Sequence, residues 1–378
     1  MQSPPEDEPG PRPGDWKILS VPLDSEPPAA IPTEEDRPPD SDWVPGPPPG
    51  GPPTGPPGGR IFSLEGRPAA GLYLIAWLFA LGGVALIFVR SVSGPDAPGG
   101  FRFVLGLAGV AALTIGLAAA AGYQVVARST RDPGWYRGPS PILCFFLVLP
   151  VSTILSVLIG LAGIDIGPGN AVGFLLGLIA VGVGYASVVW AFVVRTRALS
   201  WSDMGWPRRW SARHALNAVG LAVAVMLPAT FAVLVFGGIV ATLLGGVRAP
   251  DVLPPARSQL DAVAVALAAA LVAPIGEELF FRGFAVTAWL RDLGPRRALV
   301  RSAIFFAAVH VLNIQSTTFE VGAKQAVLVL AEIVPLGFIL GWLFLQRGIV
   351  ASIAGHVTYN SILLLLPVLI ESGTRVSG

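Results

Sequence analysis

The sequence contains apolar blocks that are longer than the core of a soluble protein requires. Nine of them can be drawn along the chain, at about 69–89, 103–126, 141–163, 171–193, 216–246, 261–290, 298–313, 325–345 and 349–370. A helix needs about 20 apolar residues to cross roughly 30 Å of hydrocarbon. Backbone groups in lipid must bond within their own segment, so these blocks are expected to be helices. The predicted fold class is all-α, a polytopic transmembrane helix bundle of about eight or nine spans.

The composition agrees with a membrane protein and argues against other classes. Hydrophobic residues make up 53% of the chain and charged residues only 13%, which is typical of membrane proteins. The net charge of +1 and the lack of a basic run give no support for a nucleic-acid partner. Cys144 is the single cysteine and is expected to pack in the core. Arginine strongly outnumbers lysine, and this bias suggests a bacterial gene and a bacterial cytoplasmic membrane.

The chain divides into three regions by composition. Residues 1–60 combine acids with a Pro/Gly-rich run, and such a segment cannot bury enough apolar area to offset its ordering entropy. We expect this region to be a disordered cytoplasmic tail. Residues 61–260 carry the N-terminal transmembrane helices, and residues 261–370 carry a second transmembrane domain with the chemically interesting residues.

Arginines in the connections predict the orientation of the helices. They gather after the second, fourth and sixth blocks, in the groups Arg128, Arg131 and Arg137, then Arg195, Arg197, Arg208, Arg209 and Arg213, then Arg291, Arg296, Arg297 and Arg301. Cytoplasmic loops carry an excess of Lys and Arg. Connections that follow even-numbered spans lie on the same side of the membrane as the N-terminus. We therefore place these three connections and the N-terminus in the cytoplasm.

The sixth block contains two adjacent carboxylates and a guanidinium, Glu277, Glu278 and Arg282, within an apolar stretch. Each such charge costs about 2.5 to 3.5 kcal/mol on membrane-insertion scales, so ionisable groups at this depth are candidates for function. Glu278 and Arg282 are four residues apart, and we expect them to form a structural ion pair on one helix face. Glu277 points about 100° away along the helix and is left available for proton transfer.

Two of the three histidines, His310 and His356, lie in later apolar blocks, and Asn360 follows His356 by four residues. With a rise of about 1.5 Å per residue, Glu277 and His310 each lie roughly 21 Å from the cytoplasmic edge. The same rise gives about 12 Å for His356 and 18 Å for Asn360. We therefore expect Glu277, His310 and Asn360 to share one layer, although a lone membrane histidine is more often a helix-to-helix hydrogen bond.

These residues form three ordered motifs on separate predicted helices, Glu-Glu-x-x-x-Arg at Glu277 to Arg282, Phe-x-x-x-His at Phe306 to His310, and His-x-x-x-Asn at His356 to Asn360. In this order they resemble the CAAX protease and bacteriocin-processing (CPBP, or Abi) family, which includes type II CAAX prenyl endopeptidases. The resemblance covers about residues 261–366. It implies an intramembrane endopeptidase that acts on a membrane-associated protein or peptide.

The resemblance also implies a role for each motif residue. Glu277 and His310 would bind and deprotonate a water that attacks a peptide carbonyl. His356 and Asn360 would donate hydrogen bonds to the resulting oxyanion. Glu278 and Arg282, the ion pair that the spacing predicts, would hold the site together.

A metal is a separate question, because members of this family have been called metalloproteases. One carboxylate and two imidazoles, from Glu277, His310 and His356, could complete a catalytic zinc site. The His-Glu-x-x-His spacing is absent, and we expect that no metal or other cofactor is required. Glu332 either lines the cavity or pairs with a neighbour, and Asn313 either orients His310 or caps a helix end.

Two other functions remain open from the sequence. An ion-coupled transporter also places charges in membrane helices, but it would be expected to show inverted repeats with broken helices, and we see none. A non-catalytic scaffold or immunity protein could keep the same fold, although an intact motif set argues against it. The sequence leaves the substrate and the oligomeric state open.

Overall fold

The protein is an all-helical bundle in the part of the chain that the structure describes. The computed structural model describes residues 63–94, 97–166, 169–209, 211–250, 253–316 and 318–376. No strand occurs within these ranges. The predicted tail, residues 1–60, lies outside the described residues.

The helices follow one another with short connections. In chain order they are α1 (Ala70–Val92), α2 (Gly99–Arg128), α3 (Pro141–Leu161), α4 (Ala171–Val189), η2 (Trp190–Val194), α5 (Ala212–Leu243), α6 (Gln259–Leu267), η3 (Ala268–Val272), α7 (Ala273–Glu278), η4 (Leu279–Val286), α8 (Thr287–Leu293), α9 (Pro295–Val311) and α10 (Phe319–Val376). The elements named η are π-helices.

The last helix, α10, is a helical hairpin that folds back on itself. Arg347 and Gly348 have non-helical backbone angles, and the Ser352 hydroxyl donates to the Leu340 carbonyl at 3.0 Å. Residues twelve apart in a straight helix would be roughly 18 Å apart. The two halves of α10 therefore correspond to the eighth and ninth predicted segments, and α6 to α8 together correspond to the sixth.

The structure supports a multi-pass membrane protein. Among the described residues, seven helices are long and apolar enough to cross a membrane, judged by length and composition alone. α10 counts as one of the seven across its kink, and α9 has 17 residues, which is just below the length required. This count agrees with the predicted polytopic bundle.

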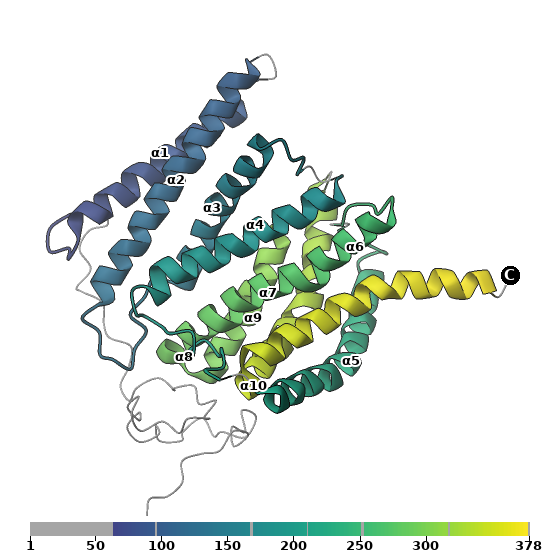
Figure 1. Ribbon diagram of the computed structural model, residues 1–378. Coiled ribbons are helices and arrows are strands. Elements are labelled where there is room, and N and C mark those ends of the chain that lie inside the picture. The colour runs from purple at the N-terminus through teal and green to yellow at the C-terminus, as the bar shows by residue number, and fades with distance from the viewer. Residues whose placement is uncertain are drawn as a thin grey trace, which may run out of the picture.

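The helices are arranged in layers that run across the bundle (Figure 1). α1 and α2 form a hairpin at one side, and α3 and α4 pack between this hairpin and the helices α6 to α8. α10 packs against both α9 and α5. The segment with the candidate site is therefore central, while the N-terminal hairpin is peripheral.

The three arginine-rich connections meet at one end of the bundle. Arg131, after α2, lies 3.5 Å from Asp292 at the end of α8, and the Tyr136 backbone N–H donates to the same carboxylate at 3.1 Å. Arg291 forms an ion pair at 3.1 Å with Asp203, in the connection that follows η2. The three connections that the arginines grouped on one side of the membrane thus lie at the same end of the bundle.

A tight backbone contact closes this end of the bundle over the α10 hairpin. Gly348 has a φ of 72°, which is a left-handed conformation that glycine adopts without steric cost. A Cβ there would lie 2.9 Å from the Gly205 carbonyl oxygen, and the Ile349 N–H donates to that oxygen at 3.3 Å. The connection before α5 therefore covers the turn between the two halves of α10.

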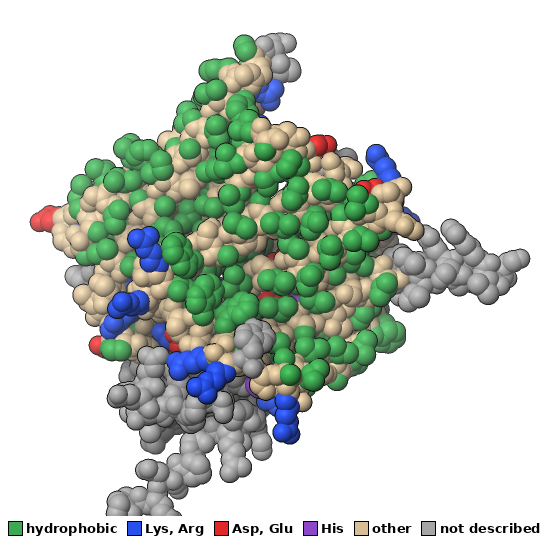
Figure 2. Space-filling view, viewed as in Figure 1, with side chains coloured by type: hydrophobic (Ala, Val, Ile, Leu, Met, Phe, Trp, Pro, Cys, Tyr) green, Lys and Arg blue, Asp and Glu red, His purple; other side chains and the backbone are tan. Residues whose placement is uncertain are grey.

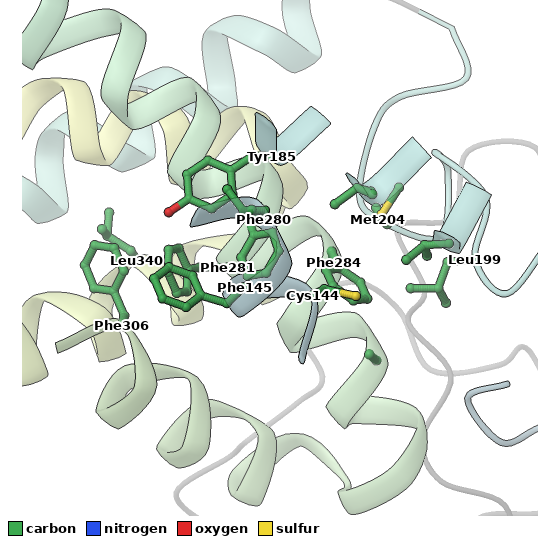
Figure 3. Close-up of a cluster of buried hydrophobic side chains, with 14 of the residues drawn as sticks. Cys144, Phe145, Tyr185, Leu199, Met204, Phe280, Phe281, Phe284, Phe306 and Leu340 are labelled. Atoms are coloured by element: carbon green, nitrogen blue, oxygen red, sulfur yellow. The ribbon is translucent and has the colours of Figure 1, made fainter. Parts of the chain in front are cut away.

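An aromatic core lies at the centre of the described helices (Figure 3). All eight residues of η4 are buried, and Phe281 packs edge-on against Phe306 of α9, with ring centroids 5.0 Å apart. Phe145 of α3 contacts Phe281 from the other side, with centroids 6.2 Å apart. Cys144 is buried within this cluster, as expected. The core thus fixes α9 against η4.

The shared end of the connections predicts a labelling pattern. In a variant that lacks Cys144, cysteines placed at the exposed positions Asp132 and Arg296 should show the same protection from a membrane-impermeant thiol reagent. A cysteine at exposed Ala249, beyond the far end of α5, should show the opposite protection. We expect the first two to be cytoplasmic, from the arginine excess. Opposite labelling of Asp132→Cys and Arg296→Cys in intact cells would contradict this topology.

Candidate active site

The helix that carries the two glutamates changes its hydrogen-bond pattern on both sides of them. α7, which contains Glu277 and Glu278, lies between the π-helices η3 and η4. Pro274 occupies the first turn of α7, where its missing N–H interrupts the ladder. π-helical turns in proteins are frequent at functional sites. The structure has a π-helical segment directly before this proline.

Glu278 is the centre of a fully buried polar network. Its side chain is 0% exposed and accepts a hydrogen bond from Arg282 at 2.7 Å, which is the ion pair that the spacing predicted. The same oxygen lies 2.8 Å from Nδ1 of His356. The second carboxylate oxygen accepts a hydrogen bond from the Ser352 hydroxyl. Three groups from two helices therefore hold this carboxylate in a low-dielectric site.

Arg282 is also enclosed by an aromatic ring. Its side chain is 0% exposed, and its guanidinium carbon lies 4.0 Å from the ring centroid of Phe306. Nε and Nη2 of this guanidinium form no hydrogen bond with the described residues. The ring face, which carries partial negative charge, offers these atoms an electrostatic contact instead.

Glu277 differs sharply from its neighbour. Its side chain is 23% exposed, and one of its carboxylate oxygens lies 3.9 Å from Nε2 of His356, which is beyond hydrogen-bond length. Within the described ranges, no hydrogen bond to this carboxylate is found. In Figure 2, acidic and histidine atoms are visible in the middle of an otherwise apolar face. One glutamate is thus fixed by the protein, and the other is accessible and unbonded.

His310 presents one ring nitrogen away from its own helix. Its Nδ1 lies 2.8 Å from the Phe306 carbonyl oxygen. A carbonyl oxygen can only accept, so Nδ1 carries the hydrogen and Nε2 of the neutral ring keeps its lone pair. His310 is partly exposed. Its Nε2 is therefore in the state that a general base or a water-binding group requires.

Phe306 brings the two histidines to the same part of the bundle. Its ring centroid is 4.5 Å from that of His310 on α9 and 5.9 Å from that of His356 on α10. Both contacts are edge-on. The phenylalanine of the Phe-x-x-x-His motif thus connects the aromatic core to the polar site.

His356 lies closer to Glu277 than the helix-rise calculation predicted. Its Nε2 is 3.9 Å from the Glu277 carboxylate, and Asn360, one turn further on, donates its Nδ2 to the Ala269 carbonyl at 2.7 Å. The calculation assumed α-helical rise throughout. The π-helical turns of η4 place more residues in each turn, so Glu277 lies closer to the end of α8 than an α-helix would put it.

Two secondary sequence candidates have different outcomes. Asn313 does not orient the His310 ring, whose Nδ1 bonds to Phe306. Its backbone N–H instead bonds to the His310 carbonyl at 3.2 Å, as part of the helix end. Glu332 lies against Gly237 of α5, and within the described ranges it has no hydrogen bond or ion pair.

Ser352 is the site residue that sequence reasoning missed. It is fully buried and connects Glu278 to the Leu340 carbonyl in the first half of α10. Ser352 precedes His356 by four residues, so both lie on one helix face. This spacing was a usable signal, because a polar residue on the same face as a candidate histidine is placed to bond its partner.

The side chains of Glu277, His310 and His356 do not gather as metal ligands would. Among the described residues, no group of three His, Cys, Asp or Glu side chains is close enough to hold a metal ion. Glu277, His310 and His356, the alternative zinc set, are therefore not grouped as three ligands in this arrangement.

Together the fold and site describe a multi-pass membrane protein with a carboxylate–histidine site inside its helices. Residues 259–362 match the family of type II CAAX prenyl endopeptidases described as Rce1-like, which confirms the CAAX protease resemblance over this segment. The match covers about a quarter of the chain and includes all the motif residues. A search of the curated proteins and a search of the solved structures found no match.

The buried network predicts that Arg282 is essential for stability. Arg282→Met leaves the Glu278 carboxylate without its cationic partner at a fully buried position, and breaking such a pair costs about 3 to 5 kcal/mol. Thermal unfolding of the purified protein in detergent should show a large fall in Tm. The matched control is Arg301→Met, since Arg301 lies over the Trp289 ring but is exposed, and its Tm should stay near that of the parent. Equal Tm values for both variants would refute the network's role.

Proposed function

We propose that this protein is an intramembrane endopeptidase that hydrolyses a peptide bond of a membrane-associated protein or peptide. The observation that carries the proposal is the contrast between the two adjacent glutamates. Glu278 is fully buried and held by three partners, whereas Glu277 is partly exposed and lies 3.9 Å from Nε2 of His356, with no hydrogen bond among the described residues. A carboxylate without stabilising bonds in a membrane helix lowers stability. Proton transfer is a function that requires such a carboxylate and accounts for its presence.

Glu277 and His310 activate water in this proposal. In the proposed reaction a water molecule binds between the Glu277 carboxylate and Nε2 of His310, and its oxygen attacks the scissile carbonyl carbon. Glu277 takes the proton that the water loses. This general-base step contributes typically 10²- to 10⁴-fold to the rate.

His356 and Asn360 supply the oxyanion donors in this proposal. Attack converts the carbonyl oxygen into an oxyanion, and Nε2–H of a protonated His356 donates to it, together with the Asn360 amide. Removing one such donor typically costs 10²- to 10³-fold in kcat. The tetrahedral intermediate then collapses, the carbon–nitrogen bond breaks, and Glu277 returns its proton to the leaving amine.

The buried network orients His356. Its Nδ1–H points to the Glu278 carboxylate at 2.8 Å, which fixes the direction of the Nε2 side of the ring. Arg282 and Ser352 hold Glu278 in place by bonding to it. Each of these residues acts through another, so they are positioning residues and not groups that touch the substrate.

The match to the type II CAAX prenyl endopeptidases supports a substrate held at the membrane. We propose CAAX-type processing near a C-terminus, or a related cleavage of a membrane-bound peptide. A bacterial host, which the arginine bias suggests, generally lacks prenylated CAAX proteins, and a different membrane-anchored chain is then the substrate. Comparing the termini of membrane proteins in cells with and without the active protein identifies it.

The proposed mechanism predicts which substitutions abolish cleavage. Glu277→Ala and His310→Ala should each lower the rate of peptide cleavage by about 100-fold or more, because each removes part of the water-activating pair. His356→Ala should cause a comparable loss through the oxyanion. The control is His214→Ala, in the first turn of α5 and outside the three motifs, which should keep parental activity. Full activity in Glu277→Ala would overturn the mechanism.

The same assay tests the role of a metal. We expect cleavage to persist after exhaustive dialysis against a strong chelator, with elemental analysis confirming metal removal. Loss of activity that zinc restores would show that a metal is required. A folded protein that cleaves no membrane peptide from the host proteome, even with Glu277 intact, would favour the non-catalytic scaffold instead.

A further inference from the structure

We infer that Pro274 positions Asn360, by leaving free the backbone carbonyl that holds the Asn360 amide beside the active site. That Pro274 leaves the Ala269 carbonyl free is inferred from the backbone hydrogen-bond pattern. The consequence for catalysis rests on the proposed function. Pro274 would then be a positioning residue, because it acts through Ala269 and Asn360 and touches no reacting atom.

The first step is the hydrogen-bond ladder of η3. At the end of this π-helix the Ala273 N–H bonds to the carbonyl of Ala268, five residues earlier. The same spacing would pair residue 274 with the carbonyl of Ala269. Residue 274 is a proline and has no N–H. The Ala269 carbonyl therefore lacks the partner that the ladder would give it.

The second step is the side chain that satisfies this carbonyl. Asn360, from the second half of α10, donates its Nδ2 to Ala269 at 2.7 Å. An unpaired carbonyl in a membrane helix costs several kcal/mol unless another group bonds to it. Asn360 thus repairs the break that Pro274 makes, from a helix about 90 residues away in the sequence.

The third step concerns what the bond leaves available. A side-chain amide has two N–H donors, and Ala269 takes one of them. Asn360 follows His356 by four residues, so the two side chains lie on the same face of α10. The Ala269 bond fixes the orientation of the amide. Its second N–H is thereby held on the face that carries His356, as an oxyanion donor requires.

Two bonds then join the same pair of helices on either side of the reactive residues. Glu278 bonds to His356 at 2.8 Å, and Ala269 bonds to Asn360 at 2.7 Å. Both members of the proposed oxyanion site are oriented by the segment that carries Glu277. Movement of one helix against the other would break both bonds, so the base and the donors keep a fixed separation.

A double-mutant cycle on thermal stability tests the bond without any need for a substrate. Asn360→Ala strands the Ala269 carbonyl and should lower Tm by about 2 to 4 °C for each kcal/mol lost. In a Pro274→Ala background the restored N–H satisfies that carbonyl, and Asn360→Ala should lower Tm much less. The matched control is Pro228→Ala, which lies inside α5 and should leave the Asn360→Ala effect unchanged. An equal Tm loss in all three backgrounds would overturn the inferred coupling between Pro274 and Asn360.

Cleavage kinetics test the positioning role separately. Pro274→Ala should lower kcat by about 10-fold with little change in KM, less than the roughly 100-fold loss expected when the donor is removed. It should cause little further loss in an Asn360→Ala background. Parental kcat in folded Pro274→Ala would overturn the positioning role while leaving the proposed protease intact.

If Pro274→Ala fails to fold, Asn360→Asp tests the same contact from the other helix. It keeps the shape of the side chain but replaces the donor NH₂ by an acceptor, so both Tm and kcat should fall. A parental Tm in Asn360→Asp would contradict the bond. If no variant and no parent cleaves any substrate, the stability cycle still decides whether Pro274 and Asn360 are coupled.

Discussion

The Glu278 carboxylate is the constraint on which the rest of the site depends. It is fully buried in a membrane helix, and a charge there is stable only when its partners are complete. Arg282 supplies the opposite charge, while His356 and Ser352 of α10 supply two more bonds. Because α9 contributes the Phe306 ring that covers Arg282, three helices are fixed around one carboxylate.

In the proposed mechanism the two adjacent glutamates have different tasks. Glu278 is held by three partners and orients His356. A general base must instead exchange protons and reach solvent or substrate. Glu277 is partly exposed and lacks a hydrogen bond among the described residues, which suits it to the second task. The adjacent positions point in different directions around the helix, so the two environments can differ within one turn.

Local features of the site were predictable from the sequence, because they depend on spacing within one helix. The apolar blocks predicted the helices, and the four-residue separation predicted the bond between Glu278 and Arg282. The arginines grouped three connections that do meet at one end. Each of these inferences needs only helix periodicity or the composition of a connection.

The remaining contacts depend on how distant helices pack. The bond between Glu278 and His356 joins residues 78 apart, and the register of α10 that permits it is set by the turn at Gly348 against Gly205. The sequence does not reveal the π-helical turns on both sides of the two glutamates. For this reason the helix-rise calculation placed His356 well below Glu277, whereas its Nε2 lies 3.9 Å from the Glu277 carboxylate.

The most direct measurement compares Glu277→Gln and Glu278→Gln, each assayed for both thermal stability and peptide turnover. The two substitutions remove the same charge at adjacent positions, so each is the control for the other. We expect Glu277→Gln to lose turnover while its Tm stays at or above the parental value, and Glu278→Gln to lose both. A Glu278→Gln protein with parental Tm and no turnover, beside an unfolded Glu277→Gln protein, would show that the two carboxylates have the opposite roles.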